Sequence, residues 1–197
     1  MASHRLALAV CGLQVFLLLA MASCDIFSPR DAEEPAGTAE WNAFPVSPHL
    51  ALQNLRYAWL YSQNASRYGE LLTDDFVFYC DQQDVVEYGV AAQWDAGAEA
   101  NILWQVYSQI ASAESVVEFT EVEGEEDVIE TDAATMVRDY RLELYFGAAE
   151  TPVMVTGRLA ADLARGQDGL WRLQTWQDSR IDNETTSWGR MKDAYRS

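Results

Sequence analysis

The sequence predicts one α+β domain over residues 47–197, with helices in its first part and an antiparallel sheet covered on one face in its second part. Apolar residues recur three and four apart in its first part, which indicates amphipathic helices. Apolar and polar residues alternate in long stretches of its second part, which indicates strands with one buried face. Turns rich in glycine and aspartate separate these stretches. The length of 197 residues suits one such domain preceded by a leader.

Three helices are expected from capping signals and apolar spacing. The first begins at Ser47 and Pro48, an N-cap hydroxyl followed by a proline at the first helical position. The second is short and covers residues 64–72. The third follows the cap residue Asp95 and runs from 96 to about 111. The apolar stripes of the first and third helices are Leu52, Leu55 and Trp59, and Ile102, Leu103, Val106, Tyr107 and Ile110.

Two strands are expected at residues 76–81 and 115–123. Three longer strands are expected at residues 136–146, 153–163 and 170–178. Residues 82–95 have no clear period and predict a loop around short structure. Gly157 in mid-strand predicts a bulge or a sharp bend. A short terminal helix is expected from 187 to about 195. The apolar face of the long strands is expected to hold Met136, Tyr140, Leu142, Leu144, Phe146, Val153, Val155, Leu159, Ala161, Leu163, Trp171, Leu173 and Trp176.

Residues 1–23 are expected to be a targeting signal. Arg5 gives a positive start, and residues 6–20 are mostly apolar. The following Met21-Ala22-Ser23-Cys24 resembles the lipobox of bacterial lipoproteins, in which Cys24 would be acylated and become the first mature residue. An ordinary secretory signal cut after Ala22 or Ser23 is the alternative. A retained membrane-spanning helix is disfavoured because the apolar run is short.

Residues 24–46 predict a flexible tether, because they hold three prolines, several acidic residues and little periodicity. A lipid on Cys24 would attach this tether to a membrane and hold the folded domain off the surface. The expected location is therefore the bacterial cell envelope, with the domain facing the periplasm or the exterior.

Composition disfavours several kinds of partner and cofactor. A formal charge of −18 disfavours nucleic acid, which needs clustered Lys and Arg. The acidic residues at 121–130 lack the spacing of a calcium loop, so no metal is expected. Zinc spacings, phosphate loops, dinucleotide fingerprints and serine elbows are absent from the sequence, so no cofactor is expected. Cys80 would be the one unmodified cysteine of the mature chain and is expected in the core.

The order helix, short helix, strand, loop, helix and long strands resembles the nuclear transport factor 2-like, or cystatin-like, fold. The residues that carry this resemblance are LLTDDFVFYCDQQD at 71–84, Gly169-Leu170-Trp171-Arg172-Leu173 with Trp176 and Asp178, and Ser187-Trp188-Gly189. They resemble bacterial lipoproteins and secreted proteins of that superfamily. The resemblance implies a curved antiparallel sheet wrapped around the N-terminal helices in the shape of a cone. It leaves function open, because members include steroid isomerases, polyketide cyclases, dehydratases and binding modules.

Asp81 is the one catalytic candidate. It ends the first strand, where the resemblance to the ketosteroid isomerase branch implies a general-base aspartate. A carboxylate at the mouth of an apolar cone has its pKa raised and can take a proton next to a carbonyl. The alternative, which the sequence favours, is a strand-end aspartate that caps the following turn.

Aromatic residues supply the candidate ligand pocket, for a small apolar ligand. Core and dimer contacts are the alternative interpretation, which the sequence favours. The outward residues Met154, Thr156, Arg158 and Ala160 carry few charges, and this favours a homodimer. The pocket candidates are Tyr79, Trp94, Trp104, Tyr107 and Tyr140.

Two functions are therefore expected to compete, and a purely structural envelope protein, which would also have a filled cone, is a third interpretation. The first is a lipid-anchored binding or accessory module of the cell envelope. The second is an enzyme of the isomerase, cyclase or dehydratase type that uses Asp81 as its general base.

Overall fold

The computed structural model describes residues 40–110, 115–146 and 151–196. The predicted signal at 1–23, with Cys24, and most of the predicted tether lie outside the described residues. Among the helices in the described ranges, none is long and apolar enough to cross a membrane.

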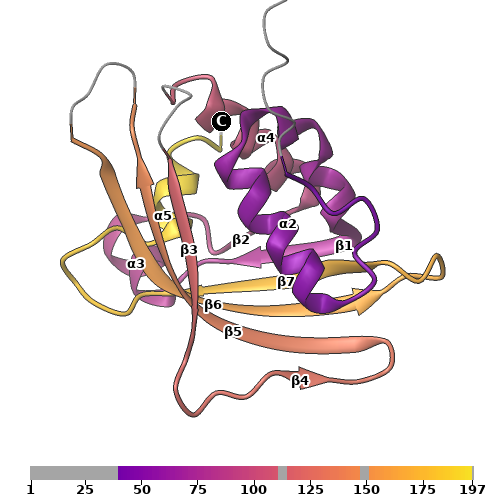
Figure 1. Cartoon of the computed structure of the whole chain (residues 1–197). Helices are drawn as coiled ribbons and strands as arrows, with labels where there is room; N and C mark the ends of the chain where they lie inside the picture. The colour runs from indigo at the N-terminus through magenta and orange to yellow at the C-terminus, as the bar shows by residue number, and fades with distance from the viewer. Residues whose placement is uncertain (1–39, 111–114, 147–150, 197) are drawn as a thin grey trace, which may run out of the picture. The chain divides into compact units, whose positions relative to one another are not determined.

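A curved sheet of seven strands forms the framework of the described domain (Figure 1). The strand order is β2-β1-β7-β6-β5-β3, and β4 pairs with β5 beside β3. The α+β class and the position of every predicted strand are confirmed. The strands are β1 (Leu72–Tyr79), β2 (Gln93–Asp95), β3 (Val116–Glu121), β4 (Val128–Ile129), β5 (Ala133–Leu144), β6 (Val153–Arg165) and β7 (Trp171–Ser179).

One pairing departs from the expected antiparallel sheet. β1 runs parallel to β7, with Phe78 opposite Trp176, while the other paired strands are antiparallel. Nearly the whole domain separates these two strands along the chain. No hairpin therefore fixes their relative direction, and local alternation carries no information about it.

The helices begin at the residues that the capping signals predict. The Ser47 side chain accepts a hydrogen bond from the Leu50 amide, and Asp95 accepts one from the Ala98 amide. In Figure 1, α2 and α4 lie together on one side of the sheet. The helices are α2 (Pro48–Leu60), the 3-10 helix η1 (Ser62–Leu71), α3 (Gln82–Tyr88), α4 (Ala96–Tyr107) and α5 (Trp188–Asp193).

Residues 82–95 hold more regular structure than the predicted loop. Asp81 caps α3, and Gly89 ends it with a positive φ of 69°, a backbone conformation that favours glycine. β2 follows and pairs with β1. The helix escaped prediction because its seven residues give too few turns for an apolar period.

Residues 40–46, at the end of the predicted tether, contact the domain. The Asn42 amide donates to Asn54 Oδ1 at 2.8 Å, and Asn54 Nδ2 donates back to the Asn42 carbonyl at 2.9 Å. The Trp171 amide donates to the Pro45 carbonyl at 2.8 Å. The folded part of the chain therefore starts before the cap residue Ser47.

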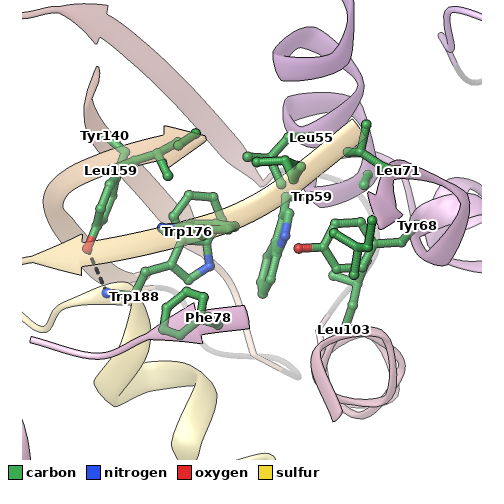
Figure 2. Close-up of a cluster of buried hydrophobic side chains, with 14 of the residues drawn as sticks. Leu55, Trp59, Tyr68, Leu71, Phe78, Leu103, Tyr140, Leu159, Trp176 and Trp188 are labelled. Atoms are coloured by element: carbon green, nitrogen blue, oxygen red, sulfur yellow. Dashed lines mark hydrogen bonds between the residues drawn. The ribbon is translucent and has the colours of Figure 1, made fainter. Parts of the chain in front are cut away.

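Large aromatic side chains fill the space between the sheet and the helices (Figure 2). Trp176 from β7 and Trp188 from α5 meet edge to face, with ring centroids 4.5 Å apart. Trp59 from α2 packs against Trp188 at 5.0 Å. All three tryptophans are almost fully buried. The terminal helix is thus part of the core, because its first residue lies at the centre of this cluster.

The bulge or bend predicted at Gly157 is absent from the pairing of β5 with β6. Gly157 instead leaves room for the side chain of Tyr140. The register between β5 and β6 is regular there, with Tyr140 opposite Gly157, and the shift between β6 and β7 lies at Asp162–Leu163. A Cβ atom on Gly157 would lie 2.6 Å from Tyr140 Cζ and 2.7 Å from the Ser179 carbonyl oxygen. Both distances are too short for real contacts.

Replacing Gly157 with alanine is expected to lower the free energy of unfolding by about 1–3 kcal/mol, because the methyl group displaces the Tyr140 ring. Urea unfolding followed by circular dichroism measures this change. Gly69→Ala is the matched control, since no heavy atom lies within 4 Å of its added Cβ. The control should unfold at the wild-type midpoint or slightly above it. Equal midpoints for Gly157→Ala and the wild type would contradict the close approach.

Candidate functional site

Asp81 is held in the turn that it caps. Its Oδ1 accepts hydrogen bonds from the amides of Gln83, at 2.7 Å, and Asp84, at 3.3 Å. Its Oδ2 accepts one from the Arg180 amide at 3.1 Å. Backbone donors therefore occupy both carboxylate oxygens, which is the arrangement of a capping aspartate.

The five aromatic pocket candidates do not gather around one cavity. Trp94 and Tyr140 are buried, whereas Tyr79 and Trp104 are 40% and 53% exposed. The Tyr107 hydroxyl donates to the Ala58 carbonyl at 2.6 Å and ties α4 to α2. Tyr79 borders a surface cavity of about 450 Å³. This cavity is lined by Tyr79, Cys80, Asp81, Gln82, Ala92, Gln93, Gln177, Asp178 and Ser179.

A buried carboxylate, Asp178, receives the first turn of α5. The Tyr140 hydroxyl donates to Asp178 Oδ1 at 2.6 Å, and the Gly189 amide donates to Oδ2 at 2.7 Å. The Trp188 amide donates to the Tyr140 hydroxyl oxygen at 2.8 Å, the contact drawn in Figure 2. Tyr140 therefore links the sheet to α5 as both donor and acceptor.

A second buried group joins α5 to α4. Lys192 and Glu99 are both 0% exposed, and Lys192 Nζ donates to Glu99 Oε1 at 2.6 Å. The Tyr68 hydroxyl donates to the same oxygen at 2.6 Å, and Trp94 Nε1 donates to Oε2 at 2.7 Å. Three donors therefore surround the carboxylate, which satisfies it without water.

Aromatic rings surround the ammonium group of Lys192. Its Nζ lies 3.5 Å from the ring centroid of Trp176 and 4.1 Å from that of Phe78. The rings of Trp188 and Trp59 follow at 5.0 and 5.4 Å. Burial lowers the pKa of the Lys192 amine, and the Glu99 carboxylate opposes this shift. We call the rings of Trp59, Phe78 and Trp176, together with the Glu99 carboxylate, the aromatic cage.

Comparisons with known proteins show the fold and no closer relationship. Neither the protein-family models nor the curated proteins give a match to this chain. Among solved structures, a candidate scytalone dehydratase from Novosphingobium aromaticivorans has a TM-score of 0.54 at 9% identity, over 72% of this chain and 91% of that one. A conserved protein from Planctomyces limnophilus has a TM-score of 0.51 at 18% identity, over 66% and 92%. A protein from Kribbella flavida has 0.51 at 17%, over 68% and 90%.

The chain has the nuclear transport factor 2-like fold. The fold that the sequence resemblance implied is confirmed. Sequence identities below 20% support a shared fold and do not support a shared function. In this chain, Trp188 and Lys192 of α5 occupy the space between the sheet and the helices.

Polar contacts fix α5 to α3 as well. The Ser187 hydroxyl, which caps α5, donates to Asp84 Oδ2, and Arg180 Nη1 lies 3.3 Å from Asp84 Oδ1. Arg180 also pairs with Glu87 at 3.1 Å. Arg180 therefore holds the start of the segment between β7 and α5, and Ser187 holds its end.

Sequence reasoning missed Lys192 and Glu99, although both carry a signal. Lys192 is the only lysine among the 197 residues. It lies one helical turn after Trp188, on the same helix face. Glu99 precedes Ile102 and Leu103 by three and four residues and so continues the apolar stripe of α4. Two opposite charges, each in line with an apolar stripe, indicate a buried pair.

Asp178 makes the stability of the domain depend on pH. Burial raises its pKa to about 6, although the hydrogen bonds from Tyr140 and Gly189 oppose the shift. In the unfolded chain this carboxyl group loses its proton near pH 4, so between about pH 4 and 6 the folded state holds the extra proton. Its contribution to stability is therefore complete below about pH 4 and is lost as the pH rises through about 6.

Replacing Asp178 with asparagine should remove this pH dependence. The free energy of unfolding of the wild type, minus that of Asp178→Asn, is expected to fall by up to about 3 kcal/mol between pH 4 and pH 7.5. Urea unfolding of both proteins at each pH measures the difference, and the exposed carboxylates cancel because both proteins carry them. A difference that stays constant or grows with pH would contradict the assignment.

Proposed function

We propose that the protein is a binding module of the bacterial cell envelope, held at the membrane by a lipid on Cys24. The observation that supports binding over catalysis is the filled interior of the cone. Trp59, Trp176 and Trp188 occupy it, and the Lys192–Glu99 pair is closed off from solvent. Asp81, the predicted base, has both oxygens engaged by backbone amides. A general base must instead reach the proton that it abstracts.

The anchor is supported by the residues before the domain. Met21-Ala22-Ser23-Cys24 follows a positive start and an apolar run, as in a lipoprotein signal. Acylation of Cys24 would leave Cys80 as the one free thiol, and Cys80 is buried beside Asp178, where burial raises its thiol pKa.

The anchor is tested by cell fractionation of the full chain expressed in a bacterium. The wild type should sediment with membranes and incorporate a labelled fatty acid, and Cys24→Ser should appear in the soluble fraction without label. Cys80→Ala is the matched control, because it removes the buried cysteine and leaves the signal intact. If Cys24→Ser still incorporates the label and still sediments with membranes, the lipid anchor on Cys24 is refuted.

The proposal includes a homodimer formed through the outer face of β6. Met154, Thr156 and Ala160 are half-buried on this face within one chain, and Arg158 pairs with Asp139 at 2.7 Å. Sedimentation equilibrium measures the mass. Ala160→Glu should convert a dimer to a monomer, and a wild-type mass of one chain would refute this part.

A second candidate function is acid–base catalysis, and Asp178 is the observation that favours it. A carboxyl group with a pKa of about 6, 2.6 Å from a tyrosine hydroxyl, is suited to proton transfer near neutral pH. The similar structure of a candidate scytalone dehydratase agrees with this chemistry. The test is deuterium uptake by a panel of enolisable ketones, followed by NMR. Uptake that Asp178→Asn abolishes, and Asp81→Asn does not, would establish the enzyme over the binding module.

A further inference from the structure

The single lysine of the chain forms a buried ion pair with Glu99, in a place that two apolar side chains would fill at lower cost. Moving an ammonium group and a carboxylate out of water costs several kcal/mol per ion, and their attraction offsets this only with good geometry. A well-packed apolar pair of similar volume is often equally stable or more so. The 12 other basic residues of the chain are all arginines. Lys192 therefore differs from the arginines of the chain in its ammonium group, and it lies fully buried.

The surroundings of Lys192 match the way proteins bind organic ammonium ions. Such ions are held over the faces of aromatic rings, with centroids within about 6 Å, and tryptophan faces attract them best. Lys192 Nζ meets this condition with Trp176 and Phe78 at 3.5 and 4.1 Å, and Glu99 neutralises its charge at 2.6 Å. Only the aliphatic stem connects this ammonium group to α5.

The indole nitrogens around Lys192 take no part in holding its ammonium group. Trp176 Nε1 and Trp188 Nε1 are buried and have no hydrogen-bond partner among the described residues. Buried polar groups in native proteins are nearly always paired, and each unpaired donor costs about 1–3 kcal/mol. An ammonium group accepts no hydrogen bond, so these two indoles contact Lys192 through their ring faces.

We propose that the aromatic cage of Trp59, Phe78, Trp176 and Glu99 is a binding site for a small organic ammonium ion, and that Lys192 occupies it as an internal ligand. The inference rests on the proposed binding function and names its ligand class. Opening of α5 withdraws Lys192 and frees the cage.

The contacts of α5 are compatible with such an opening. The helix has six residues, and polar contacts to Asp84, Tyr140 and Asp178 hold its first turn. Asn183 and Glu184, in the segment that precedes it, are exposed to solvent. Withdrawal of α5 therefore requires the loss of these hydrogen bonds and of the Lys192–Glu99 pair, and the exposure of Trp188 and Met191. It leaves the strand pairing of β5, β6 and β7 intact.

The ligand class is tested with Lys192→Ala in the full chain, because this variant vacates the cage. The probe is n-propylammonium, which restores the missing atoms of the side chain, and 1-propanol is its neutral counterpart. At about ten times its Kd, the probe should raise the folding equilibrium constant about elevenfold, while 1-propanol at the same concentration should not. Sodium chloride at equal ionic strength controls for screening.

Two further variants make the test specific. Lys192→Met keeps the cage occupied by an unbranched side chain and should show no saturable response to the probe. Lys192→Ala with Glu99→Gln should lose the preference for the cation over the alcohol. Equal effects of propylammonium and propanol on Lys192→Ala, or no saturable effect at all, would overturn the proposal.

The opening of α5 is tested on the wild type, so the proposal stays falsifiable if Lys192→Ala does not fold. Acetylation of the lone lysine by an N-hydroxysuccinimide ester is followed by mass spectrometry at increasing urea. Local opening predicts slow labelling at a rate that is independent of low urea and exceeds the rate of global unfolding. Labelling that occurs only through global unfolding would refute the internal-ligand model. Neither the probe experiment nor the labelling experiment affects membrane fractionation. The lipid anchor and the ligand site can therefore be refuted independently of each other.

Discussion

Replacing Trp188 with alanine is expected to lower the free energy of unfolding by about 3–5 kcal/mol, the usual cost of truncating a buried tryptophan. Trp188 is 0% exposed, and its ring contacts the rings of Trp59, Tyr140 and Trp176, from one helix and two strands. Figure 2 shows these side chains converging on it. Its removal would leave a cavity that α2 and the sheet cannot close without moving apart.

The matched control is Trp104→Ala, which removes the same side chain from a position that is 53% exposed. This control should stay within about 0.5 kcal/mol of the wild type. Urea unfolding followed by far-ultraviolet circular dichroism measures both changes. Similar losses for the two variants would mean that α5 does not fill the interior.

The Lys192–Glu99 pair should give the second large effect. Lys192→Met is expected to cost about 3–5 kcal/mol, because it leaves a carboxylate buried without its counter-charge. Glu99→Gln should cost a similar amount, because it leaves the ammonium group buried without a partner. The double variant should recover most of the loss, since methionine and glutamine are both neutral and Tyr68 can still donate to the amide oxygen.

A double-mutant cycle measures this coupling directly. The wild type, the two single variants and the double variant are unfolded in urea at one pH, and the interaction energy follows from the four values. A strongly favourable coupling supports the buried pair. Additive single effects would contradict it, because two residues that do not interact give no coupling term.

The sequence predicted most of this fold because most of its signals are local. Alternation over residues 136–146 and 153–163 predicted β5 and β6, and Ser47 and Asp95 predicted two helix starts. The parallel pairing of β1 with β7 was not predictable in this way, because it joins strands from opposite ends of the domain. Gly157 was recognised as special, but its reason, the ring of Tyr140 on a neighbouring strand, is a tertiary contact.

The candidate site was predicted less well, for the same reason. Asp81 was predicted as the last residue of the first strand, but β1 ends at Tyr79 and Asp81 caps α3, with the bonds expected of an aspartate before a turn. The aromatic cage of Trp59, Phe78, Trp176 and Glu99 surrounds Lys192, which is 93 residues from Glu99 along the chain. Such a group forms only when the fold brings five elements together, α2, β1, β7, α4 and α5. The available signals were the single lysine in the composition and the positions of Lys192 and Glu99 in line with apolar residues of their helices.

The most direct test of the filled interior is an NMR spectrum of the chain labelled only in lysine, which should give one set of side-chain signals. Enclosure by aromatic rings predicts that the Lys192 methylene protons are shifted upfield by ring currents and show nuclear Overhauser effects to the indole of Trp176. Sharp signals at the positions of a free lysine side chain, without contacts to aromatic protons, would contradict the account.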